Sequence, residues 1–226
     1  LSQSTSVPTA IAQYSAKVQR NSSSTGTSNI VIAQAFETVN SYDLAGQSVT
    51  LSFYAKAGAN FSASSNTLNF NVFWGQGTDQ SLASMRSNGW TNITDSSSSV
   101  TLTTTWTRYT FTASCPAGTT QVGLQFYFSP SGTAGADDAF YITGVQLELG
   151  SVATPLESRM YGYELALCQR YYFKTNDVGS GGTTGAPIVG VGSSGNGCIV
   201  CGFRFPIQMR TTPTWTFTSF NGTSGV

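Results

Sequence analysis

Two tryptophans with amide side chains nearby in the sequence are the residues best suited to bind a ligand. A flat indole ring can cover the apolar face of a sugar ring, while amides hydrogen-bond to the hydroxyl groups on its rim. Trp74 stands at the end of an expected strand and Trp90 in a polar loop, so both lie where binding residues concentrate. The candidate glycan-binding residues are Trp74, Trp90, Asn71, Gln76, Asn88 and Asn92. The alternative is that Trp74 caps the core and Trp90 fixes its own loop.

Asp137 and Asp138 are adjacent carboxylates in a loop rich in Gly and Ala, just before an expected strand. Carboxylate oxygens are ligands that Ca²⁺ prefers, so the pair is a candidate site for a structural calcium ion. Glu37 or Asp43 can add a further oxygen, although the sequence has no EF-hand spacing. The alternative is that both aspartates are solvated turn residues.

Catalytic chemistry has little support in the composition. The chain has no His, which excludes Ser-His-Asp and Cys-His mechanisms and removes the commonest metal ligand. Two acids such as Glu37 and Glu148 are the minimum for glycoside hydrolysis, but no acidic pair stands in a recognisable catalytic context. Cys198 and Cys201 have the spacing of half a zinc or redox site, yet the other two cysteines are isolated, which favours buried free thiols. We therefore expect a protein that is not an enzyme.

Charge and hydropathy argue against several partners. Lys and Arg (10) balance Asp and Glu (10), and only 9% of residues are charged, which argues against nucleic-acid binding because such binding draws most of its affinity from Lys and Arg. No stretch approaches roughly 18 consecutive apolar residues, which argues against membrane insertion. The chain begins at Leu1 without a signal-peptide pattern or an initiator Met, so we expect it to start inside a longer product. The Gly-rich stretch 179–197 lacks the Lys and helix of a phosphate-binding loop and is expected to be a flexible or subunit-contacting loop.

Apolar and polar residues alternate through most of residues 1–150, and Gly, Ser, Asn and Thr separate the alternating runs. This pattern is typical of an all-β sandwich or barrel. About seven or eight strands of this kind are best explained by two packed antiparallel sheets in a jelly roll. The expected strands lie at 14–19, 30–36, 49–55, 68–74, 100–102, 106–112, 122–128 and 140–149.

A different composition begins after Gly150. We expect residues 1–150 to form the jelly-roll domain, 151–170 to form a connector with one short helix, and 171–226 to begin a second β domain. The helix is expected over 164–170, which contains Glu, Leu, Ala and Gln. The second β domain has strand-like segments but no closing element, so we expect its remainder to be missing or supplied by another chain.

Three segments carry the most specific pattern: ITGVQLELGS at 142–151, ATPLE at 153–157 and ELALCQRYY at 164–172. Together they resemble a junction that is common in tailed-bacteriophage tail-fibre and receptor-binding proteins. In those proteins a jelly-roll module that resembles carbohydrate-binding domains precedes the junction, and a small β domain follows it. Residues 205–214 resemble a strand entry of the following domain, and residues 46–55 and 106–110 resemble strands of the jelly roll.

The resemblance implies a virion surface protein, part of a tail fibre or an equivalent appendage. Such a protein adheres to its bacterial host by weak binding of cell-surface glycan, multiplied over several copies. The resemblance also implies a homotrimer, with other virion proteins as partners. Two alternatives stay open: a structural head or tail decoration or assembly protein that binds no sugar, and a polysaccharide-binding module of a secreted bacterial enzyme. Exposed Trp74 and Trp90 would favour adhesion, whereas burial of both would favour the structural role.

Overall fold

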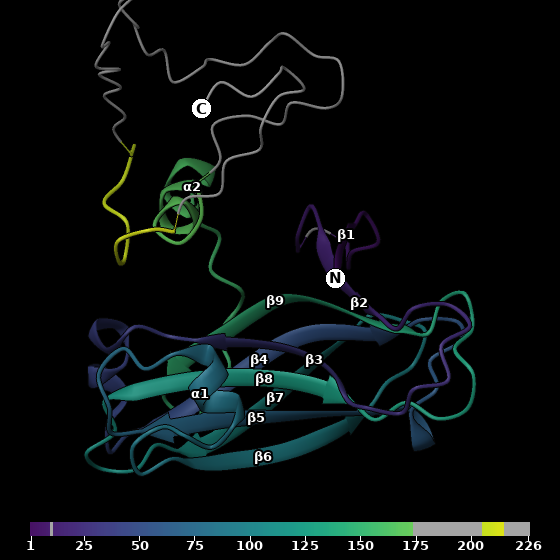
Figure 1. Ribbon diagram of the computed structural model, residues 1–226, viewed down its shortest axis with the longest axis horizontal. Coiled ribbons are helices and arrows are strands. Elements are labelled where there is room, and N and C mark those ends of the chain that lie inside the picture. The colour runs from purple at the N-terminus through teal and green to yellow at the C-terminus, as the bar shows by residue number, and fades with distance from the viewer. Residues whose placement is uncertain (10, 174–204, 215–226) are drawn as a thin grey trace, which may run out of the picture. The chain divides into compact units, whose positions relative to one another are not determined.

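The computed structural model describes residues 1–9, 11–173 and 205–214, and the chain forms two compact units, Leu1–Glu157 and Ser158–Val226 (Figure 1). In the first unit, nine strands form two antiparallel sheets. Sheet A has the strand order β1-β2-β9-β4-β7, and sheet B has the order β3-β8-β5-β6. The strands are β1 (Ser2–Ser4), β2 (Ser15–Gln19), β3 (Ile30–Ala35), β4 (Ser48–Ala57), β5 (Thr67–Gly75), β6 (Thr94–Thr101), β7 (Thr107–Ser114), β8 (Gln121–Phe128) and β9 (Ala139–Leu149).

The chain crosses between the two sheets at most of its connections. Strands β2, β4, β7 and β9 lie in sheet A, whereas β3, β5, β6 and β8 lie in sheet B. Two sheets of four antiparallel strands in this order are a jelly roll, to which β1 adds a short strand at the edge of sheet A. The predicted all-β jelly-roll sandwich is therefore confirmed.

The core lies between the sheets because alternate residues of the central strands are apolar. Phe53 on β4 meets Phe70 on β5 and Phe126 on β8 in T-shaped contacts, with ring centroids 5.3 and 4.9 Å apart. All three rings are buried in the same cluster. Because these residues point inward, the residues between them on each strand point to the outer faces of the two sheets.

The hydrophobic pattern predicts only the last part of β6 and misses both β1 and α1 (Leu82–Arg86). Strand β6 pairs only with β5, so it is an edge strand, and its run Asp95–Ser99 is polar at every position. Helix α1 is too short for a helical period to show, and Ser81 caps it by accepting a hydrogen bond from Ser84 N at 3.1 Å. Three short 3₁₀ helices complete the unit: η1 (Thr38–Asn40), η2 (Tyr42–Leu44) and η3 (Ser64–Asn66).

The described residues of the second unit contain one helix, α2 (Tyr161–Gln169), none of whose residues is buried. Beyond it, the backbone N of Arg210 donates to the carbonyl of Arg170 at 3.0 Å. Most of the predicted second β domain falls on residues 174–204 and 215–226, which lie outside the described residues. No helix in the described part of the chain is long and apolar enough to cross a membrane.

Candidate functional site

Trp74 lies on β5 with its ring in the core between the sheets. Only 2% of its surface is exposed, and it shares a cluster with Leu68 and Phe70 of the same strand. Its indole Nε1 donates to Ser96 Oγ on β6 at 3.1 Å, which provides a partner for the buried donor. The prediction that Trp74 offers a stacking face to a glycan is therefore wrong, because the position is in phase with the core-facing residues of β5.

Trp90 covers one half of the outer face of sheet B together with α1. Its ring is 3% exposed and packs with Phe73 and Met85, while Nε1 donates to the carbonyl of Ser81 at 3.0 Å. Gly123 on β8 permits this close approach, because a Cβ there would overlap Met85 Sδ. The prediction of a stacking role for Trp90 is also wrong, since the ring fixes its own loop against the sheet.

Gln76, Asn88 and Asn92 lie exposed in the loops beside α1. Asn92 Nδ2 donates to Gln76 Oε1 at 2.7 Å, so these two amides hold each other. Asn88 and Asn92 have φ angles of 55° and 48°, a left-handed backbone that Asn tolerates better than most residues. Loop geometry thus accounts for both asparagines, and their contact with a glycan stays a prediction.

The other half of the outer face of sheet B carries four polar side chains on neighbouring strands. Asn69 on β5 lies opposite Tyr127 on β8, and Asn71 lies opposite Gln125. All four are half-buried and point away from the core, because the residues between them on both strands belong to the core cluster. Among the described residues, only Asn71 of the four has a side-chain hydrogen bond, from Nδ2 to Asp95 Oδ2 at 2.8 Å. We call these four residues the amide–tyrosine face.

Asn71 is the one residue of this face that the sequence analysis identifies. The signal for the others is present, because Gln125 and Tyr127 alternate with the core residues of β8, and Asn69 stands two positions before Asn71. Tryptophan is a poor marker here, since large rings are also what a sandwich core needs. Polar residues that alternate with a hydrophobic strand indicate the exposed face more directly.

The outer face of sheet A is covered in part by the chain itself. After β9, residues 150–157, which we call the strap, are held on this face by hydrogen bonds. Glu148 Oε1 accepts from Thr154 N at 3.0 Å, and Gln146 Oε1 accepts from Glu157 N at 2.9 Å. The side chains that hold the strap are Thr50 on β4, Arg108 and Thr112 on β7, and Gln146 and Glu148 on β9.

The strap gives a physical account of the junction pattern at 142–157. Polar side chains on the outward side of β9 bind the backbone of the strap that follows. The segments 142–151 and 153–157 of the pattern therefore form one structure. Hydrogen bonds from Thr154 hold the pKa of Glu148 below its ordinary value, with smaller contributions from Gln146 and from the charge of Arg108. The carboxylate of Glu148 is thus committed to the strap, and Glu37, the other acid considered for hydrolysis, is buried.

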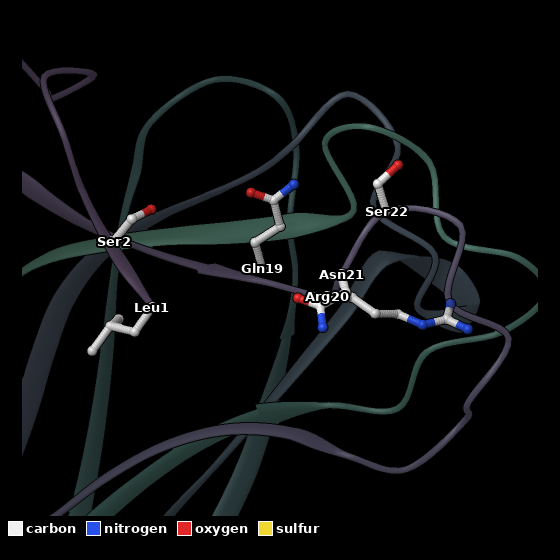
Figure 2. Close-up of a pocket in the computed structure, with 6 residues that line it drawn as sticks. All are labelled: Leu1, Ser2, Gln19, Arg20, Asn21 and Ser22. Atoms are coloured by element: carbon white, nitrogen blue, oxygen red, sulfur yellow. The ribbon is translucent and has the colours of Figure 1, made fainter.

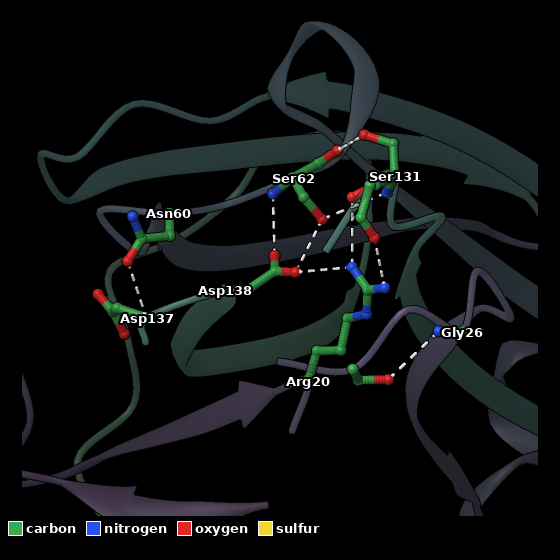
Figure 3. Close-up of polar contacts among 9 residues, drawn as sticks. Arg20, Gly26, Asn60, Ser62, Ser131, Asp137 and Asp138 are labelled. Atoms are coloured by element: carbon green, nitrogen blue, oxygen red, sulfur yellow. Dashed lines mark hydrogen bonds and ion pairs between the residues drawn. The ribbon is translucent and has the colours of Figure 1, made fainter. Parts of the chain in front are cut away.

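Asp138 is fully buried beside Arg20, which follows β2. Arg20 Nη1 lies 3.2 Å from Asp138 Oδ2, and its Nη2 donates to the carbonyl of Gly132 at 2.7 Å (Figure 3). Ser62 donates from its backbone N to Oδ1 at 2.9 Å and from Oγ to Oδ2 at 2.8 Å. A guanidinium group therefore lies where a calcium ion would have to bind the carboxylate. The prediction of calcium at Asp138 is wrong, because a protein cation already compensates the charge.

Asp137 is also paired with a protein cation. Its carboxylate contacts Lys17 Nζ at 2.7 Å and accepts hydrogen bonds from the Tyr141 hydroxyl at 2.8 Å and Ala59 N at 2.9 Å. Burial acts to raise the pKa of Asp137, but these contacts outweigh it and hold the pKa below its ordinary value. Calcium therefore does not fit Asp137 either. The described part of the chain has no cluster of three or more His, Cys, Asp or Glu residues that could hold a metal ion.

A polar hollow of about 240 Å³ lies at the end of β2 (Figure 2). Its lining residues are Leu1, Ser2, Gln19, Arg20, Asn21 and Ser22. The hollow has amide and hydroxyl groups but no aromatic ring among these residues, so it lacks a surface on which a sugar ring could stack. The amide–tyrosine face is therefore the stronger candidate.

Cys115 is buried in the core cluster, and its burial raises the pKa of the thiol. This agrees with the predicted role of a small core side chain. Cys168 lies exposed on α2. Cys198, Cys201 and the Gly-rich stretch 179–197 lie outside the described residues.

No protein-family profile matches this chain, and no curated protein sequence matches it. Among solved structures, it is similar to the enzymatically active domain of tailspike protein 4 of bacteriophage CBA120, at 16% identity over 66% of this chain and 17% of that chain, with a TM-score of 0.45. It is also similar to the CBM22-1 xylan-binding domain of Paenibacillus barcinonensis Xyn10C, at 16% identity over 63% of this chain and 76% of that chain, with a TM-score of 0.36. A family 16 carbohydrate-binding module gives 13% identity over 61% of this chain and 77% of that chain, with a TM-score of 0.36. The chain thus spans only a small part of the tailspike domain.

Proposed function

We propose that the amide–tyrosine face of sheet B binds carbohydrate. The observation that carries the proposal is the placement of four polar side chains next to one another on the outward side of β5 and β8. Three of them, Asn69, Gln125 and Tyr127, have no side-chain hydrogen bond with the described residues. Half-buried polar groups of this kind gain from a ligand, because their partial loss of water is not compensated inside the protein.

The chemistry of the face suits a neutral sugar. Each amide offers N–H donors and a carbonyl acceptor, a combination that can bond to neighbouring hydroxyl groups. Tyr127 adds a ring with a polar tip. Neighbouring side chains on one face lie about 5 Å apart across strands and about 7 Å apart along a strand, so one or two sugar rings can contact several of them.

We infer a role on the virion surface from the resemblance of the junction and the jelly roll to tail-fibre and receptor-binding proteins. The chain then belongs to a tail fibre or an equivalent appendage that adheres to a bacterial host through cell-surface glycan. Assembly as a homotrimer, with several copies on each particle, raises the weak affinity of one face through multivalency. Other virion proteins are the expected partners.

A glycan array with the purified protein tests the carbohydrate proposal. We expect the wild type to bind at least one glycan, and the Asn71→Ala/Gln125→Ala variant to bind it about tenfold or more weakly, because two hydrogen-bonding amides are removed. Thr110→Ala, at an exposed position on β7 of sheet A, is the matched control and should bind like the wild type. Unchanged binding by a folded double variant would place the site elsewhere.

A second variant distinguishes this face from the loops beside α1. Asn88→Gly/Asn92→Gly removes both loop amides, and glycine adopts the same positive φ angles without strain. We expect this variant to bind like the wild type. Loss of binding here, with binding retained by Asn71→Ala/Gln125→Ala, would place the glycan at the loops.

A structural virion protein is the second candidate function. The burial of Trp74 and Trp90 favours it, since neither ring is available to stack on a sugar. A folded and correctly assembled protein that binds no glycan on the array would support this alternative. A polysaccharide-binding module of a secreted bacterial enzyme would instead bind glycan, and sequencing of the full gene product would identify it by an attached catalytic domain.

A further inference from the structure

A row of alternating aromatic and cationic side chains crosses the outer face of sheet A. Lys56 on β4 lies opposite Tyr141 on β9, and Tyr141 lies opposite Lys17 on β2. Lys56 Nζ lies 4.7 Å from the centroid of the Tyr141 ring and 5.7 Å from that of Trp106, which precedes β7. Lys17 Nζ lies 5.4 Å from the Tyr141 centroid. We call Trp106, Lys56, Tyr141 and Lys17 the cation–aromatic row.

The two lysines of this row differ in how their charges are compensated. Lys17 forms an ion pair with Asp137 at 2.7 Å, and this contact is the main reason that the pKa of Lys17 is raised. Lys56 has no carboxylate within 4.0 Å among the described residues, and its contacts are two ring faces. A ring face attracts a cation without neutralising it, so the row keeps a net positive charge at Lys56.

Trp106 adds an aromatic surface beside Lys56. Its indole Nε1 is buried and has no hydrogen-bond acceptor among the described residues. The side chain as a whole is partly exposed, and its ring packs edge-on against Tyr141 with the centroids 6.5 Å apart. A partly exposed aromatic ring and an ammonium group without a carboxylate partner among the described residues therefore lie next to one another.

We infer that the cation–aromatic row binds a carboxylate-bearing sugar of an acidic glycan. The carboxylate pairs with Lys56 Nζ, and the apolar face of the sugar ring lies against Trp106. An inorganic anion would use the charge but not the ring, and a neutral sugar would use the ring but not the charge. This site lies on the opposite sheet from the amide–tyrosine face and does not depend on carbohydrate binding there.

Titration of the full chain with acidic sugars tests the inference. The probes are glucuronic acid, N-acetylneuraminic acid and oligogalacturonate, with glucose as the neutral counterpart. The readout is the indole N–H signal of Trp106 in a nitrogen–proton NMR spectrum, assigned with Trp106→Phe. We expect at least one acidic sugar to shift this signal and glucose to leave it unchanged. Added salt should weaken the binding, because an ion pair near the surface is screened.

Variants of Lys56 test the role of the charge. Lys56→Met keeps an unbranched side chain beside the two rings but removes the ammonium group, so the affinity for acidic sugar should fall about tenfold. Lys56→Arg keeps the charge and should retain most of the affinity. Arg86→Met removes the same charge from an exposed position on α1, beside the other sheet, and should bind like the wild type.

Two results would overturn the inference: no acidic sugar shifts the Trp106 signal of the wild type, or folded Lys56→Met binds as tightly as the wild type. If Lys56→Met does not fold, Lys56→Gln removes the same charge and takes its place. The wild-type titration needs no variant and by itself shows whether an acidic sugar binds at Trp106. The Asn71→Ala/Gln125→Ala variant separates the two sites, since it should lose neutral-glycan binding and keep acidic-sugar binding. Loss of acidic-sugar binding in that variant would contradict a second site.

Discussion

The two outer faces of the sandwich use their polar side chains differently. On sheet A, side chains of β4, β7 and β9 hold the strap, and Lys17, Asp137 and Tyr141 bind one another. On sheet B, most of the amide–tyrosine face has no side-chain hydrogen bond with the described residues. Both faces are polar, so composition does not distinguish them. The difference shows that the satisfaction of hydrogen bonds separates a face used for structure from one that remains available to a ligand.

The largest loss of stability is expected at Asp138, whose contacts join loops that connect strands of both sheets. Asp138 precedes β9 and binds Arg20 after β2 and Ser62 between β4 and β5. Asp138→Ala leaves the Arg20 charge buried without its partner, which should lower the free energy of unfolding by about 3–5 kcal/mol. Denaturant unfolding followed by tryptophan fluorescence measures this change.

The neighbouring aspartate provides the control. Asp137 forms its ion pair with Lys17 at a partly exposed position and also accepts two hydrogen bonds, so Asp137→Ala should lower the free energy of unfolding by about 1–2 kcal/mol, less than Asp138→Ala. Equal losses for the two variants would show that burial of the Arg20–Asp138 pair adds nothing. The Arg20–Asp138 pair would then not be a main stabilising contact between the loops at this end of the sandwich.

A second, smaller effect is expected in the covered half of sheet B. Gly123→Ala places a methyl group against Met85 Sδ, with the Trp90 ring also close, so α1 or Met85 must shift. We expect a loss of about 1–3 kcal/mol in the free energy of unfolding and a red shift of the tryptophan fluorescence. Gly162→Ala on α2, where no atom lies near the added methyl group, is the control and should not destabilise the protein. An unchanged free energy of unfolding in Gly123→Ala would mean that α1 is not packed on the sheet.

The sequence contains enough information for the strands other than β1 and most of β6, and for the burial of one tryptophan. The alternation that predicts β5 also places Trp74 in phase with Phe70 and Val72, so the same pattern that indicates the strand indicates a core position. The ion pair between Arg20 and Asp138 is different, because it joins residues 118 positions apart and no local pattern reveals it. The error about calcium follows directly, since the sequence shows the carboxylates but not the cations that the fold brings to them.

The contact between Glu148 and the strap should depend on pH, with an effect on stability between the larger losses above and the smallest one below. The pKa of Glu148 is lowered mainly by hydrogen bonds from Thr154, so this contact contributes stability above the ordinary Glu pKa and is lost as the pH falls through the lowered value. Gln146 and the Arg108 guanidinium are the other polar groups that act on this carboxylate. The backbone amide signal of Thr154 in NMR should therefore shift in acid.

Glu148→Gln tests the cause of that shift. The amide keeps an acceptor for Thr154 but cannot lose or gain a proton, so the acid-dependent shift of the Thr154 signal should disappear. The strap should also become more susceptible to proteolysis near neutral pH, because a charge-assisted hydrogen bond is replaced by a neutral one. A Thr154 signal that shifts equally in both proteins would assign the effect to another carboxyl group.

The smallest effect on stability is the most informative about the two faces. Asn71→Ala/Gln125→Ala removes side chains with few partners in the protein and should change the free energy of unfolding by less than about 0.5 kcal/mol. Thr112→Ala/Gln146→Ala on sheet A removes bonds to the strap and should cost about 1 kcal/mol for each lost bond. Denaturant unfolding of the two variants in parallel makes the comparison. If the sheet B variant is destabilised as much as the sheet A variant, its amides serve the fold, and their availability to a glycan is no longer supported.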